Sequence, residues 1–445
     1  MKTSVEFVNH ASVIIKSGSV AILCDPWFKG DVFHKGWDLI SQTSDKETDK
    51  ILDKISHIWI SHEHPDHFSI PFFKENANKI IEKSIKILFQ ETKDKRVLKF
   101  FKSQLLDCTE LKFNKKTYLS NDLSVSCIKD GFYDSALLVT NRDEKILNLN
   151  DCEVTTPSRV KEVLKVTGEV DVLLTQFSFA AWKGGKSNKK WRTEAAEEKI
   201  NTIALQIKYF RPKFIIPFAS FIYFSNEENF YLNDSINSPS KIWQKFKKNS
   251  SQVLIMKPLD IIGGDFEEFS TERALEFWDQ KYMDLKSKHL NKYQKIDQQE
   301  IVESFTKYCK RVTENNNVSL IKLIRTFSPI AVFRPVIVKV TDLGLVFKFD
   351  YVTKKIEQTT EGPMLSMTSE SLDFLFKNSY GFDTLTVNGC FEECSKGGFV
   401  TSAKTLAIEN LNNLGIFVVP STLFNFSIIN LFLKRLYRVA RKLNT

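Results

Sequence analysis

The sequence predicts an α/β protein in which residues 1–265 form two β-sheets packed face to face between outer helices, an αββα sandwich. Short apolar runs separated by Gly, Asn and Pro fill residues 5–27, which is typical of a meander of strands. From there to residue 218, runs typical of buried strands alternate with stretches of helical spacing. The order of meander and then alternation occurs twice, which indicates two sheets rather than one.

The first sheet is expected to begin with the three short strands of the meander, the third of which ends at Asp25-Pro26-Trp27. Helices are then expected at 45–55 and 70–81, and strands at 58–60 and 85–89, with weaker alternation over 105–118.

The second sheet is expected to start after residue 120. The predicted strands are 123–128, 136–140, 145–152, 171–177 and 213–218, and the predicted helices are 157–166 and 193–210. Loops at four strand ends, 61–67, 129–134, 150–152 and 217–221, are expected to converge on one edge.

After Gly263-Gly264 the sequence becomes more polar and charged, with helical spacing. Residues 266–415 are expected to form an accessory domain, first helical over 269–292 and in parts of 294–317, then a small α/β unit. That unit should have strands within 331–349, a helix at 369–377 and a strand at 384–389. Residues 416–445 form an amphipathic, basic tail, which predicts either peripheral membrane contact or, as the more expected alternative, a helix docked on the domain with a solvated basic end.

Composition favours a soluble globular protein, with 42% hydrophobic and 26% charged residues among 445. The net charge of +9 suggests an anionic substrate or surface, whereas no nucleic-acid-binding signature is present. The N-terminus lacks an apolar leader and no apolar run reaches the length of a membrane span. The seven cysteines are scattered and odd in number, which favours reduced thiols and a cytoplasmic location.

The chemistry of the chain is expected at His62-Glu63-His64-Pro65-Asp66-His67, directly after the apolar run Ile58-Trp59-Ile60. Three of the seven histidines of the chain lie within these six positions. Side chains two residues apart in such a loop project to the same side, so His62 and His64 can share one metal ion while Asp66 and His67 hold a second. A solvated His-rich turn is the alternative. His10, at the end of an early strand, either lines this site or is a hydrogen-bonded strand-end residue.

The His-x-His-x-Asp-His pattern at 62–67, with Asp151 at the end of a later strand, resembles the metallo-β-lactamase superfamily. The patterns at 7–13 and 24–27 are similar to the first hairpin of that superfamily. The resemblance covers about residues 4–265 and implies the αββα sandwich and a two-metal site at its edge. Within the superfamily, segments 145–152, 211–221 and 233–234 are similar to the CMP-N-acetylneuraminate hydroxylase family outside its Rieske domain.

The resemblance implies a ligand set for the two metals. Hydrolases of the superfamily usually supply a third histidine to the first metal and a late histidine to the second, and this sequence departs from that pattern. Here no histidine lies between residues 67 and 289. The expected ligands are His62, His64 and Asp130 for one ion, Asp66 and His67 for the other, and Asp151 as a bridge, with Asp134 as the alternative to Asp130. Asp66 and Asp151 are the expected catalytic carboxylates. Two divalent ions are expected, and this donor set suits iron or manganese at least as well as zinc.

Two activities follow from such a site. The favoured hypothesis is an oxygenase that hydroxylates a nucleotide sugar or a similar anionic small molecule, with electrons from an external donor because no Rieske-type Cys–His arrangement is present. The alternative is a metal-dependent hydrolase of a phosphoester, amide or related bond. Basic residues that follow Trp182 would clamp a phosphate of the substrate, or else form a solvated loop: Lys183, Lys186, Lys189, Lys190 and Arg192.

Overall fold

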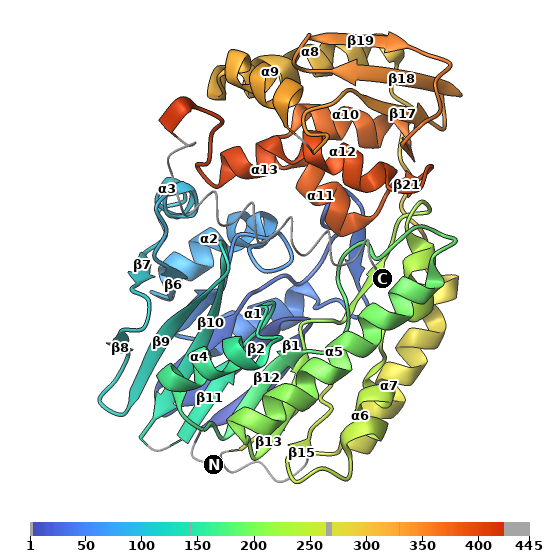
Figure 1. Cartoon of the computed structure of the whole chain (residues 1–445). Helices are drawn as coiled ribbons and strands as arrows, with labels where there is room; N and C mark the ends of the chain where they lie inside the picture. Colours follow the sequence, from blue (N-terminus) through green and yellow to red (C-terminus); the bar gives the residue numbers. More distant parts are fainter. Residues whose placement is uncertain (1–2, 143, 264–268, 329, 422–445) are drawn as a thin grey trace. The chain divides into compact units, whose positions relative to one another are not determined.

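The computed structural model describes residues 3–142, 144–263, 269–328 and 330–421 (Figure 1). The chain divides into two compact units. Unit 1 comprises Met1–Lys183, Asn188–Asn226 and Phe230–Leu290, and unit 2 comprises Gly184–Ser187, Glu227–Asn229 and Asn291–Thr445. Unit 1 thus extends beyond residue 265, because helix α7 (Thr271–Met283) buries Trp278 in its core, with the indole stacked 4.0 Å from the ring of Phe221.

Unit 1 contains two seven-stranded sheets. The first has the order β16-β1-β2-β3-β5-β6-β7 and is made of β1 (Ser4–Asn9), β2 (Ser12–Ser17), β3 (Val20–Cys24), β5 (His57–Ile60), β6 (Lys86–Gln90), β7 (Cys108–Leu111) and β16 (Ile261–Ile262). Strands β1 to β3 form the expected antiparallel meander, and β3, β5, β6 and β7 run parallel.

The second sheet has the order β15-β13-β12-β11-β10-β9-β8. Its strands are β8 (Lys116–Tyr118), β9 (Leu123–Asp130), β10 (Asp134–Asn141), β11 (Glu144–Asn148), β12 (Val172–Gln176), β13 (Phe214–Phe218) and β15 (Gln252–Val253). Strands β8 to β11 pair antiparallel, and β11, β12, β13 and β15 run parallel. The carboxyl ends of β11, β12 and β13 therefore lie at one edge of the sheet.

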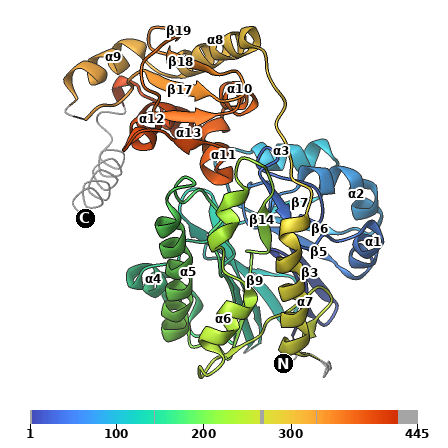
Figure 2. The ribbon, with the colours of Figure 1, turned by 90° about the vertical axis from the view of Figure 1, so that its right-hand side faces the viewer.

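The two sheets pack face to face, and helices cover their outer faces. Figure 2 shows α4 (Pro157–Thr167) and α5 (Lys189–Phe210) on one side of the strands, and α1 (Asp45–Lys54) and α2 (Ile70–Glu82) on the other. The remaining helices of unit 1 include α3 (Arg96–Ser103) and α6 (Pro239–Phe246), and a small sheet pairs β4 (Trp37–Leu39) with β14 (Ile222–Phe224). The predicted αββα sandwich is confirmed.

Strand β5 shows how the sequence sets these layers. Successive side chains of a strand point to opposite faces. Trp59 accordingly belongs to the core between the sheets, whereas Ile58 and Ile60 pack against α1, α2 and α3. A strand that is buried on both faces is continuously apolar. The polar loop at 61–67 therefore starts where β5 leaves the core.

Local capping signals fix the helices that follow the strands. Helix α1 begins with a capping box in which the Ser44 side chain accepts from the backbone N–H of Glu47, and the Glu47 carboxylate accepts from the backbone N–H of Ser44. Helix α4 has Thr156 as its N-cap and Pro157 in its first turn, and it ends at Gly168 with φ of 66°.

Unit 2 contains a five-stranded sheet of order β19-β18-β17-β20-β21 and six helices among the residues described. The strands are β17 (Val336–Val340), β18 (Leu345–Asp350), β19 (Lys355–Gln358), β20 (Leu365–Met367) and β21 (Glu392–Glu393). The helices are α8 (Gln298–Asn315), α9 (Val318–Phe327), α10 (Ser369–Lys377), α11 (Gly381–Asn388), α12 (Gly398–Leu406) and α13 (Ile408–Asn413).

The strand predicted at 384–389 is wrong, because residues 384–388 belong to helix α11 and Gly389 caps it. The β-branched residues of this segment favour a strand by propensity. Phe382 and Leu385, three residues apart, are nevertheless both buried, as one face of a helix requires. Gly389, with φ of 70°, ends the helix in a left-handed conformation.

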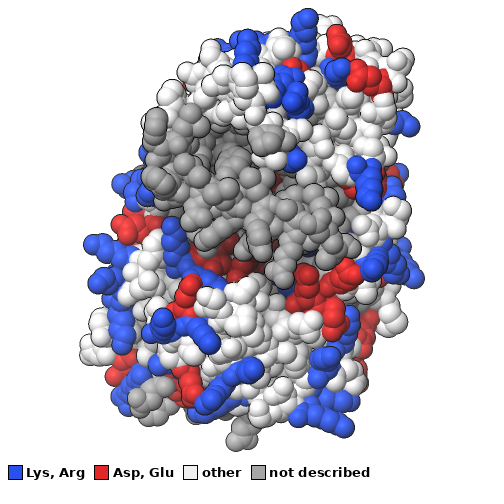
Figure 3. Space-filling model, viewed as in Figure 1, with Lys and Arg blue, Asp and Glu red and all other residues white. Residues whose placement is uncertain are grey.

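The predicted amphipathic tail lies largely outside the described residues, which end at 421. Within the described ranges between residues 3 and 421, no helix is both long enough and apolar enough to cross a membrane. On the face shown in Figure 3, Lys and Arg are dispersed among Asp and Glu rather than gathered in one stripe.

Candidate metal centre

The loop after β5 curls back on itself, so that its side chains gather in the interior. The carbonyl of His64 accepts from the backbone N–H groups of both His67 and Phe68, at 3.0 and 2.7 Å. Ser69 then caps helix α2 and ends the loop. His62 and His67 are completely buried. A solvated turn is thereby excluded for both of these histidines.

One group of potential metal ligands consists of His62, His64 and Asp134. His62 Nε2 lies 2.9 Å from His64 Nδ1 and 3.6 Å from Asp134 Oδ1. Asp134 is the first residue of β10, so the second sheet supplies a carboxylate to a histidine pair from the first sheet.

A second group consists of His10, Asp66 and His67. Asp66 Oδ2 lies 3.5 Å from His10 Nε2 and 3.4 Å from His67 Nε2. His10 lies in the turn between β1 and β2 and thus joins the site, which was one of the two interpretations left open for it.

Asp151 lies between these two groups. Its Oδ2 is 3.4 Å from His67 Nε2, and with His62 and His67 it forms a third group of potential ligands. Asp151 therefore shares one histidine with each of the other two groups, which is the placement expected of a bridging carboxylate.

Asp25, which was not among the predicted site residues, orients His67. Both side chains are buried, and Asp25 Oδ2 lies 3.0 Å from His67 Nδ1. The other carboxylate oxygen, Oδ1, accepts from the backbone N–H of Ser61 at 2.7 Å. A ring nitrogen held by a carboxylate leaves the opposite nitrogen to bind a metal, so Asp25 directs His67 Nε2 toward Asp66 and Asp151.

Several buried polar atoms at this site have no hydrogen-bond partner within the described part of the chain. They are both ring nitrogens of His10, Nε2 of His67 and Oδ1 of Asp66. Buried polar atoms nearly always form hydrogen bonds, and a cluster of imidazole nitrogens and carboxylate oxygens without such bonds matches the donors that bind divalent ions. The residues present therefore fit a metal centre.

Charges within the cluster shift the pKa values of its members. Burial lowers the pKa of His67, but Asp66, Asp151 and Asp25 outweigh burial and hold that pKa well above its usual value. Burial also lowers the pKa of His62, where the neighbouring histidines add to the effect.

The carboxylates respond to the same surroundings. Burial raises the pKa of Asp66, but the adjacent His67 and His10 hold it well below its usual value. Burial raises the pKa of Asp134 to about 7, with a further contribution from the charges of Asp151 and Asp130.

Four residues other than glycine have a positive φ at strand ends around the cluster: His10 at 26°, Asp25 at 42°, Asn150 at 37° and Ala219 at 52°. This backbone region is unfavourable for residues with a Cβ atom, and such strain concentrates at functional sites. The carbonyl of His10 accepts from the backbone N–H of Ala219 at 2.8 Å. The predicted loop at 217–221 thus reaches the site and holds His10 through its backbone.

The structure places Asp130 outside all three groups of potential ligands. Its Oδ1 accepts from Arg159 Nε at 2.8 Å, and its Oδ2 accepts from the backbone N–H of Glu153 at 2.5 Å. Both oxygens are therefore engaged away from the histidines. Of the two aspartates considered from the sequence, Asp134 is the one that lies beside His62 and His64.

The basic stretch after Trp182 does not act as one group. Arg192 is buried and forms a bidentate ion pair with Asp234, with Nε–Oδ1 of 2.9 Å and Nη2–Oδ2 of 2.8 Å. It is thus committed to the structure of unit 1. Lys186 belongs to unit 2, where its backbone N–H donates to Glu392.

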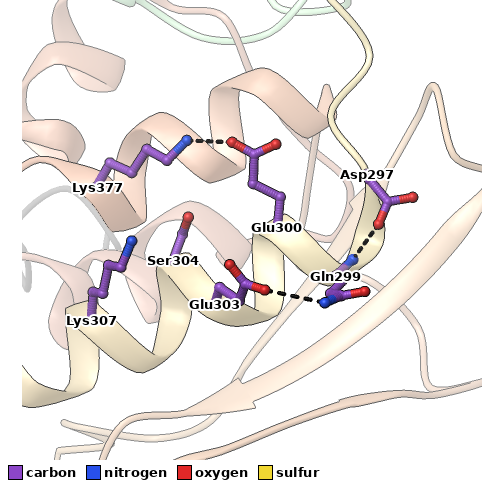
Figure 4. A pocket seen from close by; sticks show the side chains of 7 residues that line it. All are labelled: Asp297, Gln299, Glu300, Glu303, Ser304, Lys307 and Lys377. Atoms are coloured by element: carbon purple, nitrogen blue, oxygen red, sulfur yellow. Dashed lines mark hydrogen bonds and ion pairs between the residues drawn. The ribbon is translucent and has the colours of Figure 1, made fainter.

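An open hollow of about 360 Å³ in unit 2 lies at the start of α8 (Figure 4). Figure 4 shows the ion pair of Lys377 with Glu300, whose N–O distance is 2.7 Å, and Lys377 also lies 2.7 Å from Asp373. This lysine is therefore already engaged by carboxylates.

Comparison with known proteins agrees with this geometry. Residues 4–120 match the Beta-lactamase superfamily domain. The matched segment contains the loop at 62–67 together with His10 and Asp25, whereas Asp134 and Asp151 lie beyond it. The predicted resemblance to the metallo-β-lactamase superfamily is thus confirmed.

The chain is also similar to cytidine monophosphate-N-acetylneuraminic acid hydroxylase. It is 24% identical over 271 residues to the protein of Danio rerio, covering 57% of this chain and 44% of that protein. It is 25% identical over 269 residues to the human protein, which is described as inactive, covering 57% of this chain and 52% of that protein. The chain thus spans about half the length of these relatives.

Two solved structures illustrate the range of similar folds. One is CmlA, a diiron β-hydroxylase from Streptomyces venezuelae, at 11% identity and a TM-score of 0.41, covering 59% of this chain and 54% of that chain. The other is Igni18, a metallo hydrolase from Ignicoccus hospitalis, at 13% identity and a TM-score of 0.43, covering 60% and 99%.

Proposed function

We propose that this chain is an enzyme with a dinuclear metal centre. One ion would be held by His62, His64 and Asp134, the other by His10, Asp66 and His67, and Asp151 would bridge them. This assignment is supported by the three groups of potential ligands and by the unpaired buried atoms of His10, His67 and Asp66. Three aspartates and four histidines make up the donor set, which suits iron, manganese or zinc.

Two such ions, when bound, would activate either dioxygen, if they are iron, or a bridging water. The residues of the chain provide the conditions for this chemistry. The Asp25 carboxylate orients the ring of His67, and Asp66 and Asp151 supply negative charge beside it. Burial of His62 and His67 keeps bulk water away from the nitrogens that bind the ions.

We infer that the reaction is hydroxylation of an anionic small molecule of the nucleotide-sugar class. The support is the similarity to curated hydroxylases of a cytidine monophosphate sugar, together with a donor set that includes three carboxylates. One oxygen atom of O₂ would enter a C–H bond of the substrate, and the other would leave as water. The reaction would consume two electrons and two protons, with the electrons supplied by an external donor protein.

Hydrolysis of a phosphoester, an amide or a related bond is the second candidate. The observation in its favour is His10, which brings a fourth histidine to a site that the sequence had suggested to be poorer in nitrogen ligands. A more nitrogen-rich site is compatible with zinc.

We also place the protein in the cytoplasm. All seven cysteines are free, as is typical of a reducing compartment.

Metal content and turnover distinguish the two activities. The full chain, purified without added metal, would be analysed for iron, zinc and manganese and then reduced chemically with CMP-N-acetylneuraminate and O₂ present. We expect two iron ions per chain and a product heavier by one oxygen atom. Two zinc ions, no oxygenated product and steady turnover of a phosphodiester would establish the hydrolase instead. Absence of bound metal after reconstitution with each ion would refute both.

A further inference from the structure

Gln176 and Lys199 form a chain of side chains that ends on Asp151. Gln176 is the last residue of β12, and its Nε2 donates to Asp151 Oδ1 at 3.0 Å. The Nζ of Lys199, on helix α5, donates to Oε1 of the same amide. The other oxygen of Asp151, Oδ2, remains on the side of His67.

Helix α5 is fixed against the end of β12 by a second contact of the same kind. Thr175 Oγ1 donates to Gln206 Oε1 at 2.7 Å, and Gln206 Nε2 donates to the carbonyl of Val154 at 3.2 Å. Gln206 and Lys199 are seven residues apart and therefore share one face of the helix. The position of Lys199 along β12 is thus set by packing that is independent of the metal centre.

Because Lys199 lies on one side of the Gln176 amide and Asp151 on the other, only one orientation of that amide forms both hydrogen bonds. A lysine ammonium only donates hydrogen bonds, and an ionised carboxylate only accepts them. An amide between the two satisfies both when its oxygen faces Lys199 and its NH₂ group faces Asp151. The NH₂ group also approaches the carbonyl of Ala219 at 3.4 Å, on the loop that holds His10.

We propose that Lys199 is a positioning residue for the metal centre, and that it acts through Gln176 to hold Asp151 with Oδ2 directed at the ions. This inference rests on the proposed function, since it assigns Asp151 as a metal ligand. Groups that orient a metal ligand in this way contribute about 10–100-fold to metal affinity.

The charge of Lys199 by itself would have the opposite effect. A cation near the site repels divalent ions, so removing it would tighten metal binding if charge alone mattered. Removing a positioning residue loosens Asp151 and weakens metal binding. The sign of the change therefore separates the two effects.

The test compares Lys199→Met, Gln176→Leu and the double variant with the wild-type chain, using competition with a chromophoric chelator to measure the affinity of each ion. Lys190→Met is the matched control, because Lys190 lies on the same helix with its side chain 88% exposed. Far-UV circular dichroism and thermal unfolding of the metal-free proteins report whether each variant folds. Lys199→Arg keeps both the charge and the donor.

We expect Lys199→Met to weaken at least one ion about tenfold, Lys199→Arg to recover most of the loss, and Lys190→Met to change affinity less than twofold. In the Gln176→Leu background, Lys199→Met should have little further effect, because the chain of hydrogen bonds is already broken. Unchanged or tighter binding in Lys199→Met would overturn the inference, and so would an equal loss in both backgrounds. A wild-type chain that binds no metal would instead refute the proposed function itself.

Discussion

The Oδ2 atom of Asp25 lies 3.0 Å from Nδ1 of His67, and neither side chain is exposed to solvent. The same carboxylate accepts from the backbone N–H of Ser61, so it fixes both the first residue of the loop and the last potential ligand within it. The loop can therefore keep its shape before any ion binds.

Replacing Asp25 with Asn tests this role. We expect a 10–100-fold loss of metal affinity, because one of the two acceptor oxygens becomes an NH₂ group, which cannot accept a hydrogen bond from Ser61 or from His67. Competition titration of the metal measures the loss. Asp45→Asn is the control, since the Asp45 side chain is 83% exposed and pairs with Lys29. Equal affinities for Asp25→Asn and the wild-type chain would contradict the assignment.

The ligand roles of Asp134 and Asp130 can be separated by paired alanine variants. Asp134→Ala should bind one fewer ion, because it removes the carboxylate beside His62 and His64. Asp130→Ala should keep both ions and lower the stability of the fold, because it removes the acceptor of Arg159 Nε and of the backbone N–H of Glu153. Elemental analysis together with thermal unfolding measures both effects. Loss of an ion from Asp130→Ala alone would reverse the assignment.

Metal binding should weaken as the pH falls. The pKa of Asp134 in the metal-free protein is about 7, and the pKa of His67 is held well above its usual value. Both groups must lose a proton to bind a metal. Metal ions and protons therefore compete for them, and a lower pH favours the protonated, metal-free form.

We therefore expect the apparent metal affinity to fall by at least about tenfold for each pH unit below 7, since one displaced proton gives a factor of ten per unit. Titrations at pH 6, 7 and 8 measure this slope. Asp134→Asn, which cannot titrate, should show a shallower slope at a lower affinity. An affinity that is equal at pH 6 and pH 7 would contradict the prediction.

The ion pair of Arg192 and Asp234 should contribute to stability rather than to metal binding. Asp234→Ala leaves a buried guanidinium without its carboxylate, which we expect to lower the free energy of unfolding by about 2–3 kcal/mol, less than for a fully buried pair because Asp234 is partly exposed. Urea titration measures the change. Glu194→Gln, which breaks an exposed pair with Lys190 on the same helix, should cost less than about 0.5 kcal/mol. Loss of metal from Asp234→Ala without loss of stability would be inconsistent with a structural role.

The sequence predicted strands β1–β3, β5, β6 and β9–β13 and helices α1, α2, α4 and α5 of unit 1, because their signals are local, whereas it did not predict α3, α6, β4 or β14. Alternation and capping depend on residues within a few positions of one another, as at β5 and at the N-terminus of α1. For the same reason the strand predicted at 384–389 is wrong: its β-branched residues favour a strand, but Phe382 and Leu385 are both buried on one face of a helix.

For the candidate site, the sequence by itself determined the loop at 62–67, since spacing along one loop sets which side chains can meet. Three features were decided only by the tertiary structure. They are the position of His10 among the potential ligands, the contact by which Asp25 orients His67, and the placement of Asp134 rather than Asp130 beside His62 and His64. The choice of Asp134 over Asp130 depends on Arg159 of helix α4, whose Nε donates a hydrogen bond to Asp130. Such contacts join residues far apart in the chain. They arise from the packing of sheets and helices, which no local pattern encodes.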